Sequence, residues 1–215
     1  MKKILPYKIV KLRKGVVYDN RYDYQKDYIN FTFKPGSKIL DLGSGNHPAP
    51  FATHLIDLFV ENNFHRGGEG IVKDSRPLIV ADIERLPFKD KEFDFVYCSH
   101  VLEHVHNPKQ ACQEIIRIGK RGYIETPTRL SDMLYNFAHL HEWHVNLAGN
   151  TLIFIKYTDR EKKGTGSSHF FEEQVSLYDN EVKKLVYKNR DIFCNMFLWE
   201  NTFEYQVYDQ KGKLL

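Results

Sequence analysis

Lys38-Ile39-Leu40-Asp41-Leu42-Gly43-Ser44-Gly45 is the stretch of sequence that decides the fold. Apolar residues run into Asp41 and two glycines follow, which predicts a buried strand that ends in a glycine turn. Because glycine has no Cβ and adopts positive φ readily, such a turn lets backbone N–H groups approach a ligand closely. The carboxylate at the strand end favours a ligand with hydroxyl groups or a positive charge.

The composition indicates one globular domain without membrane segments. Of the 215 residues, 42% are hydrophobic and 27% are charged, and no apolar run approaches the ~20 residues that span a bilayer. The start, Met1-Lys2-Lys3, leads to Pro6 and Tyr7 instead of an apolar segment, so we expect no secretory signal. The net charge of +3 comes from mixed positive and negative residues, which does not indicate nucleic-acid binding.

The cysteines suggest a reducing compartment. Cys98, Cys112 and Cys194 are odd in number and show no CxxC spacing. They therefore indicate neither a disulfide framework nor a cysteine zinc site. We expect a cytoplasmic protein with free thiols.

Further apolar runs predict more strands, several of which end at a polar side chain. These strands span residues 54–58, 78–81, 93–99 and 122–126, with Asp57, Asp82, Ser99, His100 and Thr126 at or just after their ends. A helix is predicted from Pro108, because Asn107 suits the N-cap position, and Gly119 ends it. Alternating strands and helices predict a single α/β domain with a mostly parallel sheet, whose carboxyl edge binds ligands.

The connection after the glycine turn is unusual. Pro48 and Pro50 stand within it, which leaves no room for a long crossover helix before the next strand. We therefore expect a shortened first crossover of a turn or two. Residues 60–77, rich in glycine and polar side chains, are expected to form a loop.

The two ends of the chain are less regular in pattern. Residues 1–36 are interpreted as an N-terminal lead that covers the core, with a helix over about 18–30, and residues 37–215 as the main domain. A histidine-rich segment over about 128–150 is assigned to the acceptor side. Beyond it we expect a strand at 151–157, a polar loop at 159–168, a helix near 179–189 and a last strand at 202–208.

Three motifs, taken together, resemble those of class I S-adenosylmethionine-dependent methyltransferases, type 11-like. They are Ile39 to Gly45, Val80 to Phe88 with its Leu-Pro-Phe turn, and Phe93 to Val105, and they occur in the order and approximate spacing of that family. The resemblance covers roughly residues 37–127. It implies a Rossmann-like domain with a mostly parallel seven-stranded sheet and helices on both faces.

The resemblance also implies a cofactor, S-adenosyl-L-methionine, with S-adenosyl-L-homocysteine as the product. The residues that it assigns to the cofactor lie at strand ends: Asp41, Gly43, Ser44 and Gly45 on the methionine and ribose side, Asp57 at the ribose hydroxyls, Asp82 and Ile83 at the adenine, and Ser99 and His100 beneath the methyl group. Buried carboxylates are costly unless they find such partners. The alternative is that each aspartate only caps the following element.

His100, Glu103 and His104 are the catalytic candidates, since the spacing i, i+3, i+4 places them on one face of a helical turn. Either histidine suits a general base at neutral pH. Alternatively, the three residues and a distal histidine from 139 to 144, such as His144, hold a divalent metal, which resembles methyltransferase subgroups with a Glu-x-x-Glu-His pattern. A structural role is the third possibility.

The function expected from these residues is methyl transfer to oxygen or nitrogen of a small polar acceptor. A sugar, nucleotide-linked or phosphorylated intermediate of surface glycan biosynthesis is one such acceptor, and neither nucleic acid nor membrane is an expected partner. The alternatives are a non-catalytic S-adenosylmethionine-binding protein and a nicotinamide oxidoreductase, although the loop lacks G-x-G-x-x-G. The candidates for contact with the acceptor lie in one segment: Thr128, Arg129, Tyr135 and Trp143.

Overall fold

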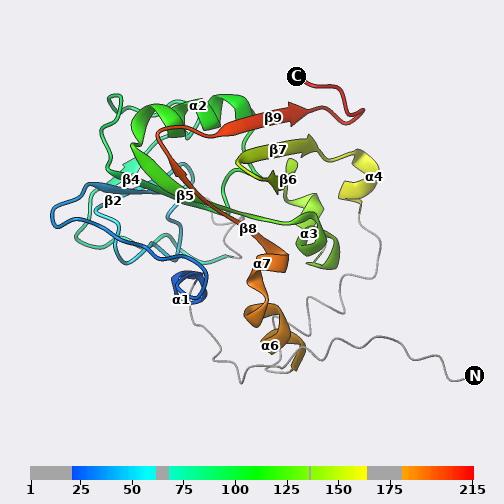
Figure 1. The fold of residues 1–215 in the computed structure, drawn as a ribbon, viewed down its shortest axis with the longest axis horizontal. Coiled ribbons are helices and arrows are strands. Elements are labelled where there is room, and N and C mark those ends of the chain that lie inside the picture. Colours follow the sequence, from blue (N-terminus) through cyan, green and yellow to red (C-terminus); the bar gives the residue numbers. More distant parts are fainter. Residues whose placement is uncertain (1–20, 62–67, 136, 164–180) are drawn as a thin grey trace, which may run out of the picture.

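The computed structural model describes residues 21–61, 68–135, 137–163 and 181–215, and its central feature is a six-stranded sheet (Figure 1). The strand order is β3-β2-β1-β4-β5-β8. The strands are β1 (Ile39–Leu42), β2 (His54–Asp57), β3 (Leu78–Val80), β4 (Phe95–Ser99), β5 (Arg121–Pro127) and β8 (Cys194–Glu200). All neighbours pair in parallel except β5 and β8, which are antiparallel. The expected α/β class with a mostly parallel sheet is confirmed.

A second, three-stranded sheet packs on the first. It consists of β6 (Trp143–Ala148), β7 (Thr151–Lys156) and β9 (Glu204–Tyr208), in that order. The central sheet of the described residues therefore has six strands where seven were expected, because the strands predicted at 151–157 and 202–208 pair with each other instead of joining it. The inner faces of both sheets contribute to one hydrophobic core.

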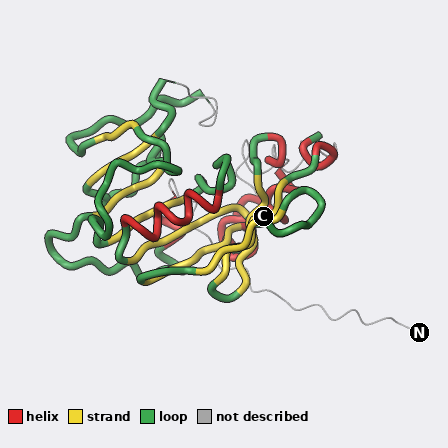
Figure 2. The backbone as a smooth tube through the Cα atoms, turned by 90° about the horizontal axis from the view of Figure 1, so that it is seen from above, coloured by secondary structure: helices red, strands yellow, loops and turns green. Residues whose placement is uncertain are grey.

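Alternation along the central strands divides their side chains between two cores. Leu40 and Val96 face the core that α2 (Pro108–Ile118) and the small sheet cover, whereas Ile39 and Phe95 face the opposite one. Figure 2 shows α2, the longest described helix, lying along the strands. Its N-cap is as predicted, since the Asn107 side chain accepts a hydrogen bond from Gln110 N.

The opposite face is covered largely by aromatic side chains from irregular backbone. The connection between β1 and β2 contains no helix, which confirms the shortened first crossover. Phe51 from this connection packs with Phe31 and Phe33 of the N-terminal segment against Phe95. These rings contribute the burial that a crossover helix would otherwise provide.

Short helices complete both faces of the sheet (Figure 1). They are α1 (Arg21–Gln25), α3 (Arg129–Tyr135), the 3-10 helix η2 (Phe137–His139), α4 (Asp159–Lys162), α6 (Glu181–Lys188) and α7 (Arg190–Phe193). Helix α6 agrees with the helix predicted near 179–189, and α1 ends at Gln25, before the end of the helix predicted over about 18–30. No helix in the described ranges is long and apolar enough to cross a membrane.

Some sequence-based expectations on element positions were wrong. Residues 159–162 form α4 instead of a loop, because Thr158 and Glu161 make a capping box. Strands β6 and β8 were not predicted. Residues 1–20, half of the predicted loop at 159–168 and part of the loop at 60–77 lie outside the described residues. The division of the chain at residue 36 stays a prediction.

Gly122 is the position in the sheet where a side chain has no room. A Cβ there would lie 2.3 Å from Val96 O and 2.8 Å from the Trp199 ring. We expect Gly122→Ala to lower the free energy of unfolding by about 1–3 kcal/mol, through overpacking between β4 and β5. Urea unfolding measures the change. Gly70→Ala, where no atom lies within 4 Å of the added Cβ, is the matched control, and equal stability of the two variants would contradict this packing.

Candidate active site at the carboxyl edge of the sheet

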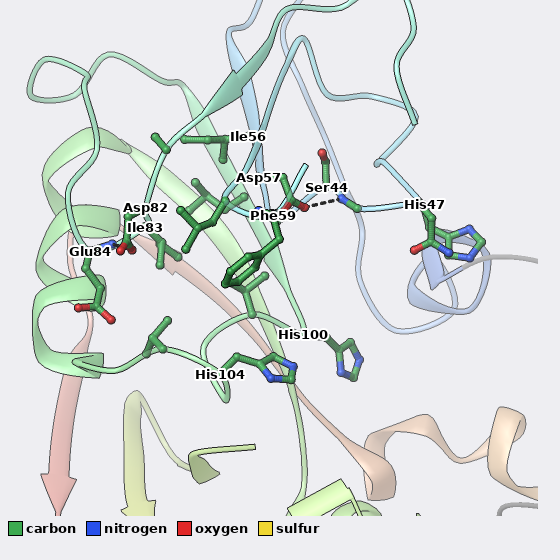
Figure 3. A pocket seen from close by; sticks show the side chains of 18 of the residues that line it. Ser44, His47, Ile56, Asp57, Phe59, Asp82, Ile83, Glu84, His100 and His104 are labelled. Atoms are coloured by element: carbon green, nitrogen blue, oxygen red, sulfur yellow. Dashed lines mark hydrogen bonds between the residues drawn. The ribbon is translucent and has the colours of Figure 1, made fainter. Parts of the chain in front are cut away.

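A cavity of about 770 Å³ lies at the carboxyl ends of β1 to β4. Its walls come from the turns that follow these strands and from the segment after α3. Eight of the sequence-predicted site residues line it: Gly43, Ser44, Gly45, Asp57, Asp82, Ile83, His100 and His104. Asp41, Ser99 and Glu103 are not among the lining residues. Figure 3 shows Asp82 and Ile83 on one side, His47 on the other, and His100 next to His104 below them.

The glycine turn brings the backbone to the cavity, but its N–H groups donate hydrogen bonds within the protein. Gly43 and Gly45 have φ values of 68° and 54°, and a Cβ on Gly43 would lie 2.4 Å from Val101 Cγ2. Gly43 N and Ser44 N donate to Ile56 O, at 2.8 and 3.1 Å. The expected free N–H groups are thus engaged within the protein. The glycines serve the close packing of this turn.

Asp57 and Asp82 both line the cavity, and both also hold their own turns. Asp57 accepts from Gly45 N at 3.0 Å and from Phe59 N at 2.9 Å. Asp82 accepts from Glu84 N at 2.9 Å. A carboxylate offers about four lone pairs, so the bond to Glu84 N leaves Asp82 able to accept from a ligand as well.

Asp41 points away from the cavity, toward the aromatic face of the sheet. Its Oδ2 accepts a hydrogen bond of 2.7 Å from Ala49 N, which secures the short connection between β1 and β2. Burial raises the pKa of Asp41 to about 7, although the Ala49 bond and the charges of Arg21 and Arg76 lower it. The structure thus gives Asp41 a partner within the fold, and its cofactor role stays a prediction.

His100 is held between two buried carboxylates. Its Nε2 lies 2.9 Å from Glu125 Oε1, and its Nδ1 lies 3.4 Å from Glu103 Oε1. Burial would lower the pKa of His100, but contacts with Cys194 and the two glutamates hold it well above the usual range. An imidazolium in this position has no free lone pair at neutral pH, which disfavours the general-base role predicted for His100.

Glu125 is a site residue that the sequence prediction missed. It is fully buried and accepts hydrogen bonds from Tyr24, Gln25 and Tyr123 as well as contacting His100. Burial would raise the pKa of Glu125, but these partners lower it to about 2. A glutamate inside the apolar run that predicted this strand was a signal, because a charge is buried only when it is compensated.

A second polar cluster lies beside the first. Glu103 is fully buried, and its Oε1 lies 4.0 Å from His104 Nε2. The rings of His104 and His141 meet edge to face with centroids 4.7 Å apart. Burial would raise the pKa of Glu103, but hydrogen bonding to His100 and the charges of the neighbouring histidines lower it to about 2.

His144 does not join this cluster. It is buried beneath Tyr157, with ring centroids 5.4 Å apart, and burial lowers its pKa. Among the later histidines in the described residues, His141 instead approaches Glu103 and His104.

The acceptor-side candidates do not line the cavity. Trp143 is in the core and donates from Nε1 to Val105 O at 2.7 Å. Thr128 bonds to Ile192 O, Arg129 pairs with Glu161, and Tyr135 packs in a separate small core. From this segment, Phe137 reaches the cavity instead.

The pKa of Asp41 predicts a pH-dependent stability. In the unfolded chain this group ionises near its ordinary value of 3.8, whereas in the fold it keeps its proton up to about pH 7. The stability of the wild type relative to Asp41→Asn should therefore be greatest below pH 4 and fall between pH 4 and 7, by roughly 4 kcal/mol. Urea unfolding at pH 4, 5.5, 7 and 8 measures this difference. A difference that stays constant across the range would show that Asp41 is ionised throughout.

Comparison with known proteins finds a family match over part of the chain. A family model described as a methyltransferase domain matches residues 40–124. A demethylmenaquinone methyltransferase from Renibacterium salmoninarum is 37% identical over 93 residues, which are 41% of this chain and 39% of that protein. An uncharacterised protein from Methanocaldococcus jannaschii is 37% identical over 84 residues, 39% of this chain and 38% of that protein. The chain thus spans about two fifths of the length of these curated relatives.

Two solved structures share a more distant likeness. A complex of the Haloferax volcanii Trm112 methyltransferase activator with a methyltransferase matches 78% of this chain and 83% of the solved chain, at 14% identity and a TM-score of 0.46. The YcgJ protein from Bacillus subtilis matches 69% of this chain and 81% of the solved chain, at 16% identity and a TM-score of 0.36. Both likenesses are too weak to add to the sequence match.

The matched residues include the part of the chain that builds most of the cavity. They contain the glycine turn, Asp57, Asp82 and both candidate catalytic histidines. The strand order and the family match agree with the resemblance drawn from the three motifs. Residues 40–124 of this chain are therefore similar to a methyltransferase domain.

Proposed function

We propose that this chain is an S-adenosylmethionine-dependent methyltransferase that acts on oxygen or nitrogen of a small polar acceptor. The observation that carries the proposal is the cavity, because its two sides differ in chemistry. The turns after β1, β2 and β3 supply glycine backbone and carboxylates, and the turn after β4 supplies His100 and His104. Its volume lies in the range of small-molecule and cofactor sites.

The cofactor side has the donor and acceptor groups that S-adenosyl-L-methionine requires. Asp57 and Asp82 end neighbouring strands and suit ribose hydroxyls and the adenine amine, while Ile83 offers an apolar surface to a ring. Arg21, which the sequence prediction missed, lines the cavity near the glycine turn and suits a carboxylate. When bound, the cofactor supplies an electrophilic methyl group.

The histidine side positions the acceptor. His100 presents a cation that is fixed by Glu103 and Glu125 and orients an acceptor oxygen by charge. His104 Nδ1 lies 3.2 Å from Leu140 O, so that carbonyl fixes a proton on Nδ1 and leaves Nε2 as an acceptor. His104 is therefore the better of the two histidines for receiving a proton.

The lining residues favour a neutral acceptor within the proposed class. Arg21 is the one arginine or lysine among the described residues of the wall, and the carboxylate of the cofactor is its suitable partner. A phosphorylated acceptor would need a further cation, because Glu103 and Glu125 already balance the charge of His100. The sugar member of the proposed set, an intermediate of surface glycan biosynthesis, thus fits better than the phosphorylated members. The names of some relatives include another acceptor, demethylmenaquinone. The family match ends at residue 124, before the segment that carries Phe137.

Substitution of Gly43 tests the cofactor site. Because an added Cβ would clash with Val101 at a backbone of positive φ, we expect Gly43→Ala to displace the turn and raise the Kd for S-adenosyl-L-homocysteine at least tenfold in calorimetry. Asp82→Asn, which keeps an oxygen for the Glu84 bond, should raise it roughly 5- to 100-fold by loss of charge-assisted bonds. Gly70→Ala is the folded control and should bind as the wild type does.

Titration with NAD separates the proposal from an oxidoreductase. We expect heat with S-adenosyl-L-homocysteine and none with NAD. Clear binding of NAD, together with no binding of the homocysteine compound, would overturn the proposal.

A non-catalytic cofactor-binding protein is the second candidate, and His104 separates the two. For an enzyme, His104→Gln should change the Kd for S-adenosyl-L-homocysteine less than threefold but slow its formation from S-adenosyl-L-methionine at least tenfold, since an amide cannot accept the proton. The assay supplies a small-molecule extract as the source of acceptors. No formation above spontaneous breakdown with the wild type would support the non-catalytic candidate.

A further inference from the structure

We propose that Glu84 is a positioning residue, which joins the turn after β3 to the turn after β4 and thereby sets the place of His104 in the cavity wall. Its Oε1 accepts hydrogen bonds from two successive backbone N–H groups, His106 N at 2.7 Å and Asn107 N at 2.8 Å. Figure 3 shows Glu84 beside Asp82 and above the loop that carries His104. The importance of this link for turnover rests on the proposed methyltransferase function, whereas the link itself does not.

The turn after β3 is one end of the link. Asp82 accepts a hydrogen bond from Glu84 N at 2.9 Å, and both residues line the cavity. The backbone of Glu84 is thus bound to the residue that is proposed to hold the cofactor, while its side chain reaches across to residues 106 and 107. One residue therefore connects the cofactor side of the cavity to the segment that follows His104.

The bonds to Glu84 are not needed to cap helix α2. This helix begins at Pro108, and Asn107 already caps it, because the Asn107 side chain accepts a hydrogen bond from Gln110 N at 3.2 Å. The N–H groups that bond to Glu84 belong to the cap residue and to the residue before it, which lie outside the helix. These bonds are charge-assisted, and a carboxylate near a helix N-terminus is further favoured by the helix dipole. Glu84 therefore holds the approach to the helix.

The turn after β4 is also fixed to other parts of the fold. At its start, His100 contacts the carboxylate of Glu125, and further along Val105 O accepts a hydrogen bond from Trp143 Nε1 at 2.7 Å. These contacts fix the turn to β5 and to the small sheet. The bonds to Glu84 fix the end of the turn to the cofactor side of the cavity, so they relate two sides that the other contacts do not connect.

This connection matters for methyl transfer because the reaction depends on the distance between the methyl group and the acceptor. A misplacement of about 1 Å can lower a rate by about 100-fold. In the proposed function, Asp82 holds the adenine and His104 receives a proton from the acceptor. Loss of the Glu84 bonds should therefore displace His104 without removing the carboxylate of Asp82.

Amide hydrogen exchange of the whole, ligand-free protein tests the link directly. Exchange at His106 and Asn107, followed by NMR, should be about 5- to 20-fold faster in Glu84→Ala than in the wild type, because the hydrogen bonds that protect these amides are lost. Glu84→Gln keeps an oxygen that can accept from both N–H groups, so its exchange should stay within about threefold of the wild type. Equal exchange in Glu84→Ala and the wild type would overturn the link.

Two further variants complete the set. Glu84→Asp keeps the charge but is one methylene group shorter, so it should lose both bonds and exchange as Glu84→Ala does, which preserves the test if the alanine variant folds poorly. Glu92→Ala is the matched control, because Glu92 also accepts from a backbone N–H, that of Lys89 at 3.0 Å. Neither Glu92 nor Lys89 is among the described residues of the cavity wall. Exchange at residues 106 and 107 should not change in this control.

Kinetics separate positioning from a general loss of structure. With saturating S-adenosyl-L-methionine and the extract as the source of acceptors, Glu84→Ala and Glu84→Asp should form S-adenosyl-L-homocysteine about tenfold more slowly than the wild type. The Kd for S-adenosyl-L-homocysteine should change less than about threefold, and Glu84→Gln should restore most of the rate. An equal loss of rate and affinity, or the same loss in Glu92→Ala, would overturn the positioning role. No turnover by the wild type would contradict the methyltransferase proposal instead, and the exchange rates would still decide the link.

Discussion

The buried carboxylate of Glu125 is the interaction on which much of the structure depends. A charge at a fully buried position in the sheet is tolerated only with several donors around it. Those donors come from three places in the chain, since Tyr24 and Gln25 belong to α1, Tyr123 to β5 and His100 to the turn after β4. One side chain thus fixes the N-terminal segment to the sheet and sets the position of a histidine in the cavity wall.

The buried Glu125 also fixes the backbone at the edge of the cavity. His100 has a positive φ of 56°, which is uncommon for a residue with a side chain. Its backbone N–H bonds to Glu125 O, and its ring bonds to the carboxylate of the same residue. The turn after β4 is therefore fixed by two contacts to one neighbour. The other turns of the cavity are fixed in a similar way, by Asp57 and Asp82 accepting from their own backbone.

Local patterns in the sequence were enough to predict the parallel strands and α2. Each of these elements has a continuous apolar run or a helical stripe with a cap, and those signals do not depend on distant residues. Strands β6 and β8 were missed because they lie in segments of mixed polarity, and β8 gains its place by antiparallel pairing with β5 across more than sixty residues. Strand pairings between such distant segments depend on tertiary packing and not on the local sequence.

The sequence predicted the kind of site, but it did not predict every residue of the site correctly. The motifs identified the residues at the turns, and the structure places Gly43 to Gly45, Asp57, Asp82, His100 and His104 around one cavity. Asp41 shows the limit, because alternation along β1 directs its side chain to the far face of the sheet. Glu125 and Arg21 were missed because their places depend on how α1 packs on the sheet.

The short connection between β1 and β2 has a consequence for where this domain can be divided. Without a crossover helix, the aromatic face of the sheet is closed by Phe31 and Phe33, which precede the matched residues 40–124. A fragment cut at the family boundary would lose this cover and expose the rings of Phe95 and Tyr97. Any minimal unit that folds therefore has to begin before the strand where the family match starts, because the preceding segment is part of the core.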